Sequence, residues 1–398
     1  MIETDFSAKE PALGYYYQIR YSLYLLLKQR ENDDIELALE QLDDIVIEDV
    51  NSAKTNLFQT KLHIKSVANL TNASPDLWKT IRVWSDSVIK KHVDPTKTLF
   101  TLITTAKASE SAITHELCKP SGIRDNEEIL KILEETSQLS KSDTNEKAYT
   151  AFHQLTTAQK KALIEHIHIL DASLDIEQVK QKTLDELKLS TTPDKLVPFY
   201  ERLEGWWFQR CILNLFQDMA NITFHEVQGK IYDIQDHFRT DNLPIDFIET
   251  IQIGDQEAEE DHRIFVQQLR LIVLGKSLIK NAISDYYRAI EQRSKWVREG
   301  LVNPDEETRY EAELIGYWEP KFALMKDDVE ASGDVTEEEY HQLGKSFYTN
   351  YYIKTCPQKY FRERVTSEFL ARGSSHFLAD RKMIGWHPYY AERLENEL

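Results

Sequence analysis

Acidic, amide and lysine side chains between residues 35 and 61 have types and spacing that suit a hydrolytic site. Asp44 opens a short apolar run, and Gln59 and Lys61 end the next run, beyond a polar turn at residues 51–53. Hydrolysis of a phosphodiester bond requires a divalent ion to polarise the phosphate and a cation or base near the attacking water. These residues therefore indicate metal-dependent phosphodiester chemistry.

The candidate residues differ in the part that each could take. Mg²⁺ prefers one or two carboxylates and keeps water and phosphate oxygens as its other ligands. Asp44 and Gln59 offer a carboxylate and an amide oxygen to Mg²⁺, or to Mn²⁺ as an alternative, and Thr60 offers a backbone carbonyl. Lys61 would orient the water or stabilise developing charge. Glu40 would be a further ligand or a supporting base.

The alternation of side chains along a strand places Gln59 and Lys61 on one face. Both would then point toward the same cleft as Asp44. The alternative is an acidic, solvated hairpin face in which Lys61 pairs with Glu40, Asp43 or Asp44. An apolar strand context opposes this alternative, because unpaired charge is costly to bury there.

The flanking segments predict the elements that must position these residues. We expect a helix at about residues 15–29, strands near 35–40, 43–47 and 57–61, a helix at 76–91 and a strand at 97–106. This order of helix, three strands, helix and strand predicts a small mixed α/β unit.

The remainder of the chain is mainly helical in pattern. Residues 107–200 predict helices with one further strand at 167–171, and the chain beyond 200 predicts almost only helices. An acidic linker at 254–262 is expected before a helix pair at 265–278 and 283–297. We therefore expect an α/β domain at 1–200 and a mainly α-helical domain at 201–398.

Composition limits the class of protein. The 398 residues carry 48 Lys and Arg against 67 Asp and Glu, a net charge of −19, whereas a protein that simply coats DNA is usually basic. The three cysteines are isolated, which favours a reducing cytoplasm over a disulfide or zinc framework. We expect no signal peptide and no membrane association, because the longest apolar run, Leu269 to Gly275, is too short to span a bilayer.

Three segments together resemble a known nuclease family. They are GYYYQIRYSLYLLL, the acidic run from Glu40 to Ile45, and the Phe-Gln-Thr-Lys run that ends at Lys61. They are similar to the PD-(D/E)xK-type double-stranded DNA endonuclease domain of CBASS-associated effectors and of Lamassu-type, ABC three-component antiphage systems. The resemblance covers about residues 10–200 and includes LTTAQKKALIEHIHILDAS.

This resemblance implies a restriction-endonuclease-like core and a DNA-cleaving, antiphage function. It carries the acid of the first motif onto Asp44, the second metal ligand onto Gln59 and the lysine onto Lys61. Many relatives have Asp or Glu where this chain has Gln59, which leaves open whether one or two metals bind. The residue before Asp44 is Asp43 and not the proline of the bare motif.

The second half resembles the C-terminal domain of the same three-component effectors. The segments NAISDYYRAIEQRSKWVREGLV (281–302) and IGWHPYYAERL (384–394) carry this resemblance. It implies docking to an SMC-like ABC ATPase subunit and a small accessory subunit. With the acidic charge, it favours an effector that partners hold inactive and that homo-oligomeric assembly activates. A non-catalytic adaptor that binds DNA or an SMC-like partner, and an RNA-cutting enzyme, remain as alternatives.

Overall fold

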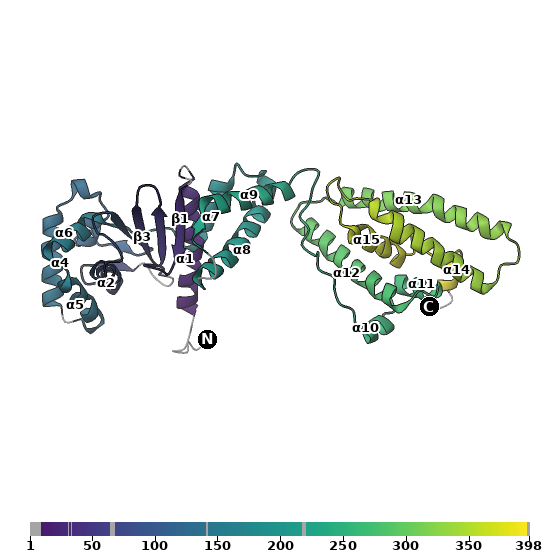
Figure 1. Cartoon of the computed structure of the whole chain (residues 1–398), viewed down its shortest axis with the longest axis horizontal. Coiled ribbons are helices and arrows are strands. Elements are labelled where there is room, and N and C mark those ends of the chain that lie inside the picture. The colour runs from purple at the N-terminus through teal and green to yellow at the C-terminus, as the bar shows by residue number, and fades with distance from the viewer. Residues whose placement is uncertain are drawn as a thin grey trace. The chain divides into compact units, whose positions relative to one another are not determined.

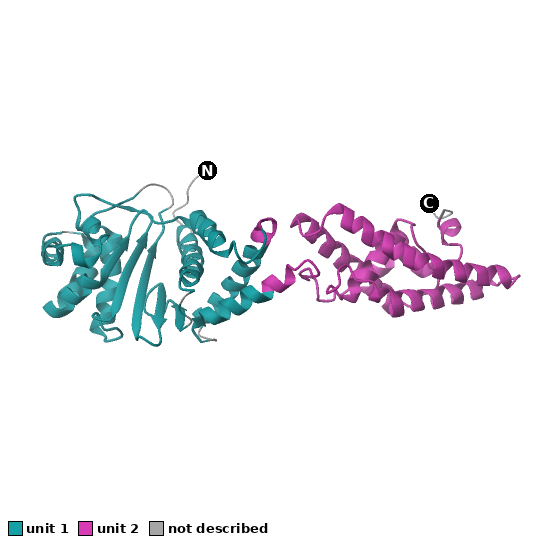
Figure 2. Ribbon diagram, turned by 90° about the horizontal axis from the view of Figure 1, so that it is seen from above, with its two compact units in different colours: residues 1–192, 199–233 teal, residues 193–198, 234–398 magenta. Residues whose placement is uncertain are grey.

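The computed structural model describes residues 9–30, 32, 34–63, 68–140, 142–216 and 220–395. The chain divides into two compact units, coloured separately in Figure 2. Unit 1 comprises residues 1–192 and 199–233, and unit 2 comprises residues 193–198 and 234–398.

Residues 9–237 form an α/β arrangement whose strands and helices are labelled in Figure 1. The elements are α1 (Lys9–Lys28), β1 (Ile35–Leu39), β2 (Ile45–Asp49), β3 (Lys54–Lys61), β4 (Asn69–Leu70), α2 (Pro75–Ile89), β5 (Thr98–Thr104), β6 (Lys107–Ala108), α3 (Ile113–Leu117), α4 (Asn126–Leu139), α5 (Glu146–Gln154), α6 (Thr157–His166), β7 (Ile167–Leu170), α7 (Ile176–Leu187), α8 (Leu196–Leu215), β8 (Ile222–Thr223) and α9 (Phe224–His237). The predicted order of helix, three strands, helix and strand is therefore confirmed, with the two-residue strand β4 added before α2.

The main sheet has six strands in the order β7-β5-β3-β2-β1-β8. Strands β3, β5 and β7 are parallel, whereas β1 and β2, β2 and β3, and β1 and β8 are antiparallel. Strands β4 and β6 form a separate parallel pair. The sheet is therefore mixed, as the sequence predicts.

The boundary predicted at residue 200 is too early. Strand β8 pairs with β1, where Ile222 lies opposite Leu37, so the edge of the sheet in unit 1 is completed from beyond residue 200. A two-residue strand is too short to produce an alternating pattern, which is why the sequence predicts almost only helices beyond residue 200.

The hydrophobic core of unit 1 lies between the sheet and the helices α2, α4, α5 and α6. The strands contribute Leu57, Phe100 and Leu102, and the helices contribute the fully buried Trp84 and Phe152, among others. Helix α1 packs on α7 and on β3. Figure 1 shows the strands between these two groups of helices.

A turn stabilised by its own side chains separates β2 from β3. The carboxylate of Asp49 accepts hydrogen bonds from the backbone N–H groups of Asn51 and Ser52, at 3.0 Å each. Such Asx contacts favour a tight turn. The register that follows pairs Ile45 with Phe58 and brings the start of β2 to the end of β3.

Unit 2 is helical beyond an irregular segment. Its elements are α10 (Asp255–Glu260), α11 (Ile264–Leu271), α12 (Lys276–Arg298), α13 (Pro304–Ala331), α14 (Glu337–Tyr348), a π-helical segment Thr349–Thr355, α15 (Glu368–Asp380) and α16 (Tyr390–Glu395). Among the described residues, none of the helices combines the length and apolar character that a membrane crossing requires.

Two predicted boundaries in unit 2 are wrong. The acidic segment at 254–262 contains the helix α10 and is not only a linker. The first helix of the predicted pair ends at Leu271 instead of 278, because the chain turns through Val273, whose φ is 52°. The tryptophans Trp296, Trp318 and Trp386 are buried, as expected of core residues.

Candidate active site

The predicted site residues lie at the strand ends on one side of the main sheet. Because β1 and β3 are each antiparallel to β2, the ends of β1 and β3 and the start of β2 lie at the same edge. Glu40 follows β1, Asp44 precedes β2 and Lys61 ends β3. The parallel strand β5 ends beside β3, where Lys61 pairs with Thr104.

Asp44 is bound directly to β3. Its carboxylate oxygen Oδ2 accepts a hydrogen bond from the backbone N–H of Thr60 at 2.7 Å and another from Thr60 Oγ1 at 2.8 Å. Among the described residues, the other carboxylate oxygen, Oδ1, has no hydrogen-bond partner. Asp44 is half-buried, so one of its oxygens is held by the strand and the other is left for a ligand.

The backbone of Thr60 is directed toward Asp44. Lys61 O accepts a hydrogen bond from Thr105 N, so the backbone groups of Lys61 point toward β5. Successive residues of a strand direct their backbone groups to alternate neighbours, and the N–H and C=O of one residue share a side. The Thr60 carbonyl is thus directed away from β5, to the side where Asp44 lies.

Gln59 and Lys61 flank Thr60 and share the face of the sheet that carries Leu57. Gln59 is 5% exposed, and Lys61 is half-buried. Burial and the charge of Asp44 raise the pKa values of Glu40 and Asp43, and the charge of Lys61 partly offsets that rise. The structure thus joins Asp44 to Thr60 and places Glu40 and Lys61 at the neighbouring ends of β1 and β3, whereas the Gln59 side chain lies on the face of β3 opposite that of Thr60.

Glu40 lies in the turn between β1 and β2. Its φ of 53° is left-handed, a conformation that costs a non-glycine residue about 1–2 kcal/mol. The turn is closed by a hydrogen bond from Glu40 N to Asp44 O, at 3.2 Å. Although the residue is partly exposed, desolvation and then the charge of Asp44 raise the pKa of its carboxyl. The strained turn therefore holds two acidic groups close together.

Asp43 is a buried acid behind this turn. Its Oδ2 accepts a hydrogen bond from Trp84 Nε1 at 2.5 Å, and its Oδ1 accepts one from the backbone N–H of Asp44 at 3.0 Å. Burial, followed by the charge of Asp44, raises the pKa of Asp43 to about 7. Asp43 therefore joins the site to helix α2 and is not part of a solvated hairpin face.

Gln18 on α1 is a member of the site that the sequence analysis missed. Its Nε2 donates a hydrogen bond to the backbone carbonyl of Asp44, and its side chain also bonds the carboxylate of Glu40. The available signal was a buried polar residue within the apolar face of the predicted helix. Gln18 is 4% exposed, between the core residues Tyr17 and Tyr21 of α1.

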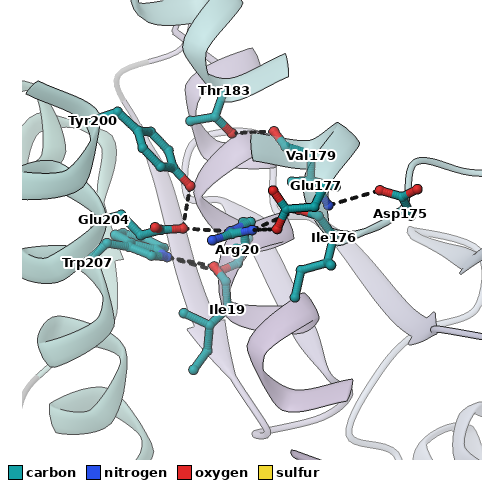
Figure 3. Close-up of polar contacts among 11 residues, drawn as sticks. Ile19, Arg20, Asp175, Ile176, Glu177, Val179, Thr183, Tyr200, Glu204 and Trp207 are labelled. Atoms are coloured by element: carbon teal, nitrogen blue, oxygen red, sulfur yellow. Dashed lines mark hydrogen bonds and ion pairs between the residues drawn. The ribbon is translucent and has the colours of Figure 1, made fainter. Parts of the chain in front are cut away.

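Polar contacts from α7 and α8 fix the position of α1 (Figure 3). Arg20 Nε donates to Glu204 Oε1 at 2.6 Å, and Arg20 Nη1 donates to the carbonyl of Ile176 at 2.9 Å. Trp207 Nε1 donates to the carbonyl of Ile19 at 2.8 Å. Because Gln18 lies next to these residues in α1, the same contacts position Gln18 at the site.

His63 lies two residues beyond the end of β3, against the start of α2. Strand β3 ends at Lys61, and His63 N donates to Thr105 Oγ1 at 2.8 Å. Its ring Nε2 lies 2.8 Å from Asp76 Oδ2, in the first turn of α2. His63 therefore pairs with α2 just beyond the candidate site.

The donors at the site suit a hard divalent cation. Asp44 Oδ1, the Gln59 amide oxygen and the Thr60 carbonyl are all oxygen ligands, the type that Mg²⁺ and Mn²⁺ take together with water. Within the described ranges, no three His, Cys, Asp or Glu side chains converge as a metal-binding group. The residues therefore fit an ion that retains several waters and do not fit a closed structural metal site.

A comparison with family models gives a match in the second half of the chain. Residues 265–394, which lie in unit 2, match CTD7, described as C-terminal domain 7 of the ABC-three component (ABC-3C) systems. This match supports a component of an ABC-3C system, as the resemblance of the C-terminal segments implies. A comparison with curated proteins gives no match.

Solved structures give only distant similarity. One is the Moraxella osloensis Cap4 SAVED/CARF-domain containing receptor, with 14% identity over 67% of this chain and 60% of that chain and a TM-score of 0.35. Another is the Acinetobacter baumannii Cap4 receptor with the cyclic trinucleotide 2′3′3′-cAAA, with 14% identity over 70% of this chain and 59% of that chain and a TM-score of 0.36. The chain thus spans about three-fifths of each, and these TM-scores support no argument about ligand or activity.

Proposed function

We propose that this chain is the nuclease component of an ABC three-component antiphage defence system and that it hydrolyses double-stranded DNA. The observation that carries the proposal is the pairing of Asp44 with Thr60, which lies between Gln59 and Lys61 at the end of β3. The match of unit 2 to an ABC-3C domain supports the defence context.

A bound Mg²⁺ or Mn²⁺ would polarise the scissile phosphate and lower the pKa of a coordinated water. Asp44, Gln59 and the Thr60 carbonyl would hold the ion. Lys61 would orient the attacking water and neutralise charge that develops on the phosphate. Glu40, whose pKa is raised, can accept a proton near the water. Gln18 would keep Asp44 and Glu40 in place through its two hydrogen bonds.

Unit 2 is proposed to dock the partner subunits, an SMC-like ABC ATPase and a small accessory protein. Among the described residues at these strand ends, Glu40, Asp43 and Asp44 outnumber Lys61, so the site would repel a DNA backbone until cations bind. We therefore expect weak activity from the isolated chain and strong activity when several nuclease units assemble.

The test is a plasmid-degradation assay with Mg²⁺, with and without co-expressed partners. Lys61→Ala should reduce the rate by at least about 10²–10³-fold. Lys54→Ala is the matched control, because Lys54 is exposed at the opposite end of the same strand and should leave the rate unchanged. Survival of both DNA degradation and the defence phenotype in Lys61→Ala would refute the catalytic assignment.

The same assay separates the alternatives. If neither the wild type nor Lys61→Ala degrades DNA, and the variant still provides defence, the chain is a non-catalytic adaptor. Cleavage of RNA but not of duplex DNA by the wild-type preparation would identify an RNA-cutting enzyme.

A further inference from the structure

A polar cavity of about 360 Å³ lies within unit 2, away from the candidate nuclease residues in sequence. Its walls come from the irregular segment before α10, from α12, from the π-helical segment and from α15. The residues that line it are Thr250, Leu278, Asn281, Asp285, Arg288, Tyr352, Ile353 and Arg372.

One buried carboxylate is shared by two arginines in this cavity. Asp285 accepts hydrogen bonds from Arg372 Nε at 2.7 Å, from Tyr352 Oη at 3.0 Å and from Arg288 Nη1 at 3.4 Å. Asp285 and Arg288 are both less than 10% exposed. Two positive charges therefore share one negative charge where water screens poorly.

The two guanidinium groups are close enough to affect each other. Burial lowers the pKa of Arg288, and the charge of Arg372 adds to that effect, against the opposing charge of Asp285. Glu368 offsets Arg372 only from the outside, since its side chain is 63% exposed. Counted with Glu368, two carboxylates balance the two arginines, but Asp285 is the buried one and both guanidinium groups share it.

Arginine N–H groups remain available for a ligand. Arg372 uses Nε for Asp285 and Nη1 for Glu368, and among the described residues its Nη2 has no hydrogen-bond partner. Arg288 is held by the carbonyls of Phe247 and Ile248. Two guanidinium groups that line one cavity offer N–H donors of the kind that oxyanions accept.

The helices α12 and α15 pack closely against each other beside the cavity. At Gly373 a Cβ atom would lie 2.0 Å from the Asp285 carbonyl, so only glycine lets α15 pack this closely on α12. Tyr352 and Ile353 belong to a π-helical segment, an uncommon conformation that is frequent at functional sites. Thr250 and Asn281 are exposed at the mouth and add polar groups.

We propose that this cavity binds the phosphate group of a small phosphorylated molecule between Arg288 and Arg372. Arginine suits phosphate because its planar N–H groups bind two oxygens at once. The volume lies near the lower end of the about 300–1,000 Å³ typical of ligand pockets, so a compact ligand of mononucleotide size fits. The site is independent of the proposed nuclease activity.

The test uses the full chain and follows thermal unfolding with inorganic phosphate, chloride at matched ionic strength, AMP and adenosine. Phosphate and AMP should each raise Tm saturably, by about 4 °C at 100 times Kd, and chloride and adenosine should not. Tighter binding of AMP than of phosphate identifies a nucleotide ligand, and equal binding identifies phosphate alone. No saturable response to phosphate or AMP would overturn the proposal.

Two variants test whether the rise in Tm with phosphate comes from this cavity. Arg372→Gln should weaken phosphate binding at least about 10-fold, because it removes a charged donor. Asn281→Trp should abolish binding by filling the mouth, without touching the ion pairs of Asp285. Arg381→Gln is the matched control, since Arg381 follows α15 and pairs with Glu311. Retained binding in a folded Arg372→Gln protein, or in Asn281→Trp, contradicts the proposal.

Discussion

Each unit holds a cluster of charged side chains, and the two clusters differ in their ratio of carboxylates to cationic groups. Among the described residues at the strand ends of unit 1, Glu40, Asp43 and Asp44 outnumber Lys61. In unit 2, the buried Asp285 lies between Arg288 and Arg372, and Glu368 bonds Arg372 from the exposed side. Carboxylates outnumber the cation in the first cluster, whereas guanidinium groups outnumber the buried carboxylate in the second.

The difference shows that local charge, and not the total of −19, decides what each cluster attracts. Burial, and then the charge of Asp44, raise the pKa values of Glu40 and Asp43, and a divalent cation would relieve that repulsion. The two guanidinium groups that share the buried Asp285 would instead accept an anion. The comparison leads to the following predictions, from the largest effect to the smallest.

Asp44→Asn should reduce Mg²⁺-dependent DNA hydrolysis by about 10³-fold, because it removes the ionised ligand while keeping an oxygen for Thr60. Calorimetric titration with Ca²⁺ should show lost cation binding. Asp285→Asn serves as the control, and its rate per folded molecule should stay within about threefold of wild type. Equal losses in both variants would contradict the separation of the two clusters.

Asp285→Ala should destabilise unit 2 by about 3–5 kcal/mol, because it leaves the buried Arg288 and the half-buried Arg372 without the carboxylate that they share. Urea unfolding measures this loss. Added phosphate should restore part of it in the variant, since a bound anion would replace the missing charge. A loss below about 1 kcal/mol would show that Asp285 does not compensate the arginines.

The pH dependence of stability should report Asp43. Its pKa is about 7 in the folded protein against 3.8 for an exposed aspartate, so the folded state binds the proton more tightly. The resulting stability is complete below about pH 4 and is lost as the pH rises through about 7, by about 2–4 kcal/mol. Urea unfolding without divalent ions should show this slope in wild type and a flatter one in Asp43→Asn.

Tyr352→Phe should cost only about 1 kcal/mol, because Asp285 loses one neutral donor and keeps both arginines. Urea unfolding measures this change. Tyr232→Phe, at a tyrosine that is 60% exposed, should change stability by less than about 0.5 kcal/mol. A cost above about 3 kcal/mol would mean that the tyrosine, and not the arginines, holds the carboxylate.

The elements around the site were predictable because their patterns are local. The apolar runs of β1 and β2 and the position of Pro75 at the start of α2 are encoded within a few residues. The alternation along β3 also placed Gln59 and Lys61 on one face. The strand β8 and the division near residue 233 were not predictable, because they depend on a pairing over about 185 residues of sequence with β1.

The sequence by itself determined the mixed α/β order and the helical second half, and it predicted Glu40, Asp44, Gln59, Thr60 and Lys61 as a site at adjoining strand ends. Only the tertiary structure decided that Gln18 and Trp84 reach Asp44 and Asp43 from two different helices. It also decided that Asp285 and Arg372, 87 residues apart, share one cavity. Strand patterns depend on neighbouring residues, whereas burial and charge pairing depend on side chains that only folding brings together.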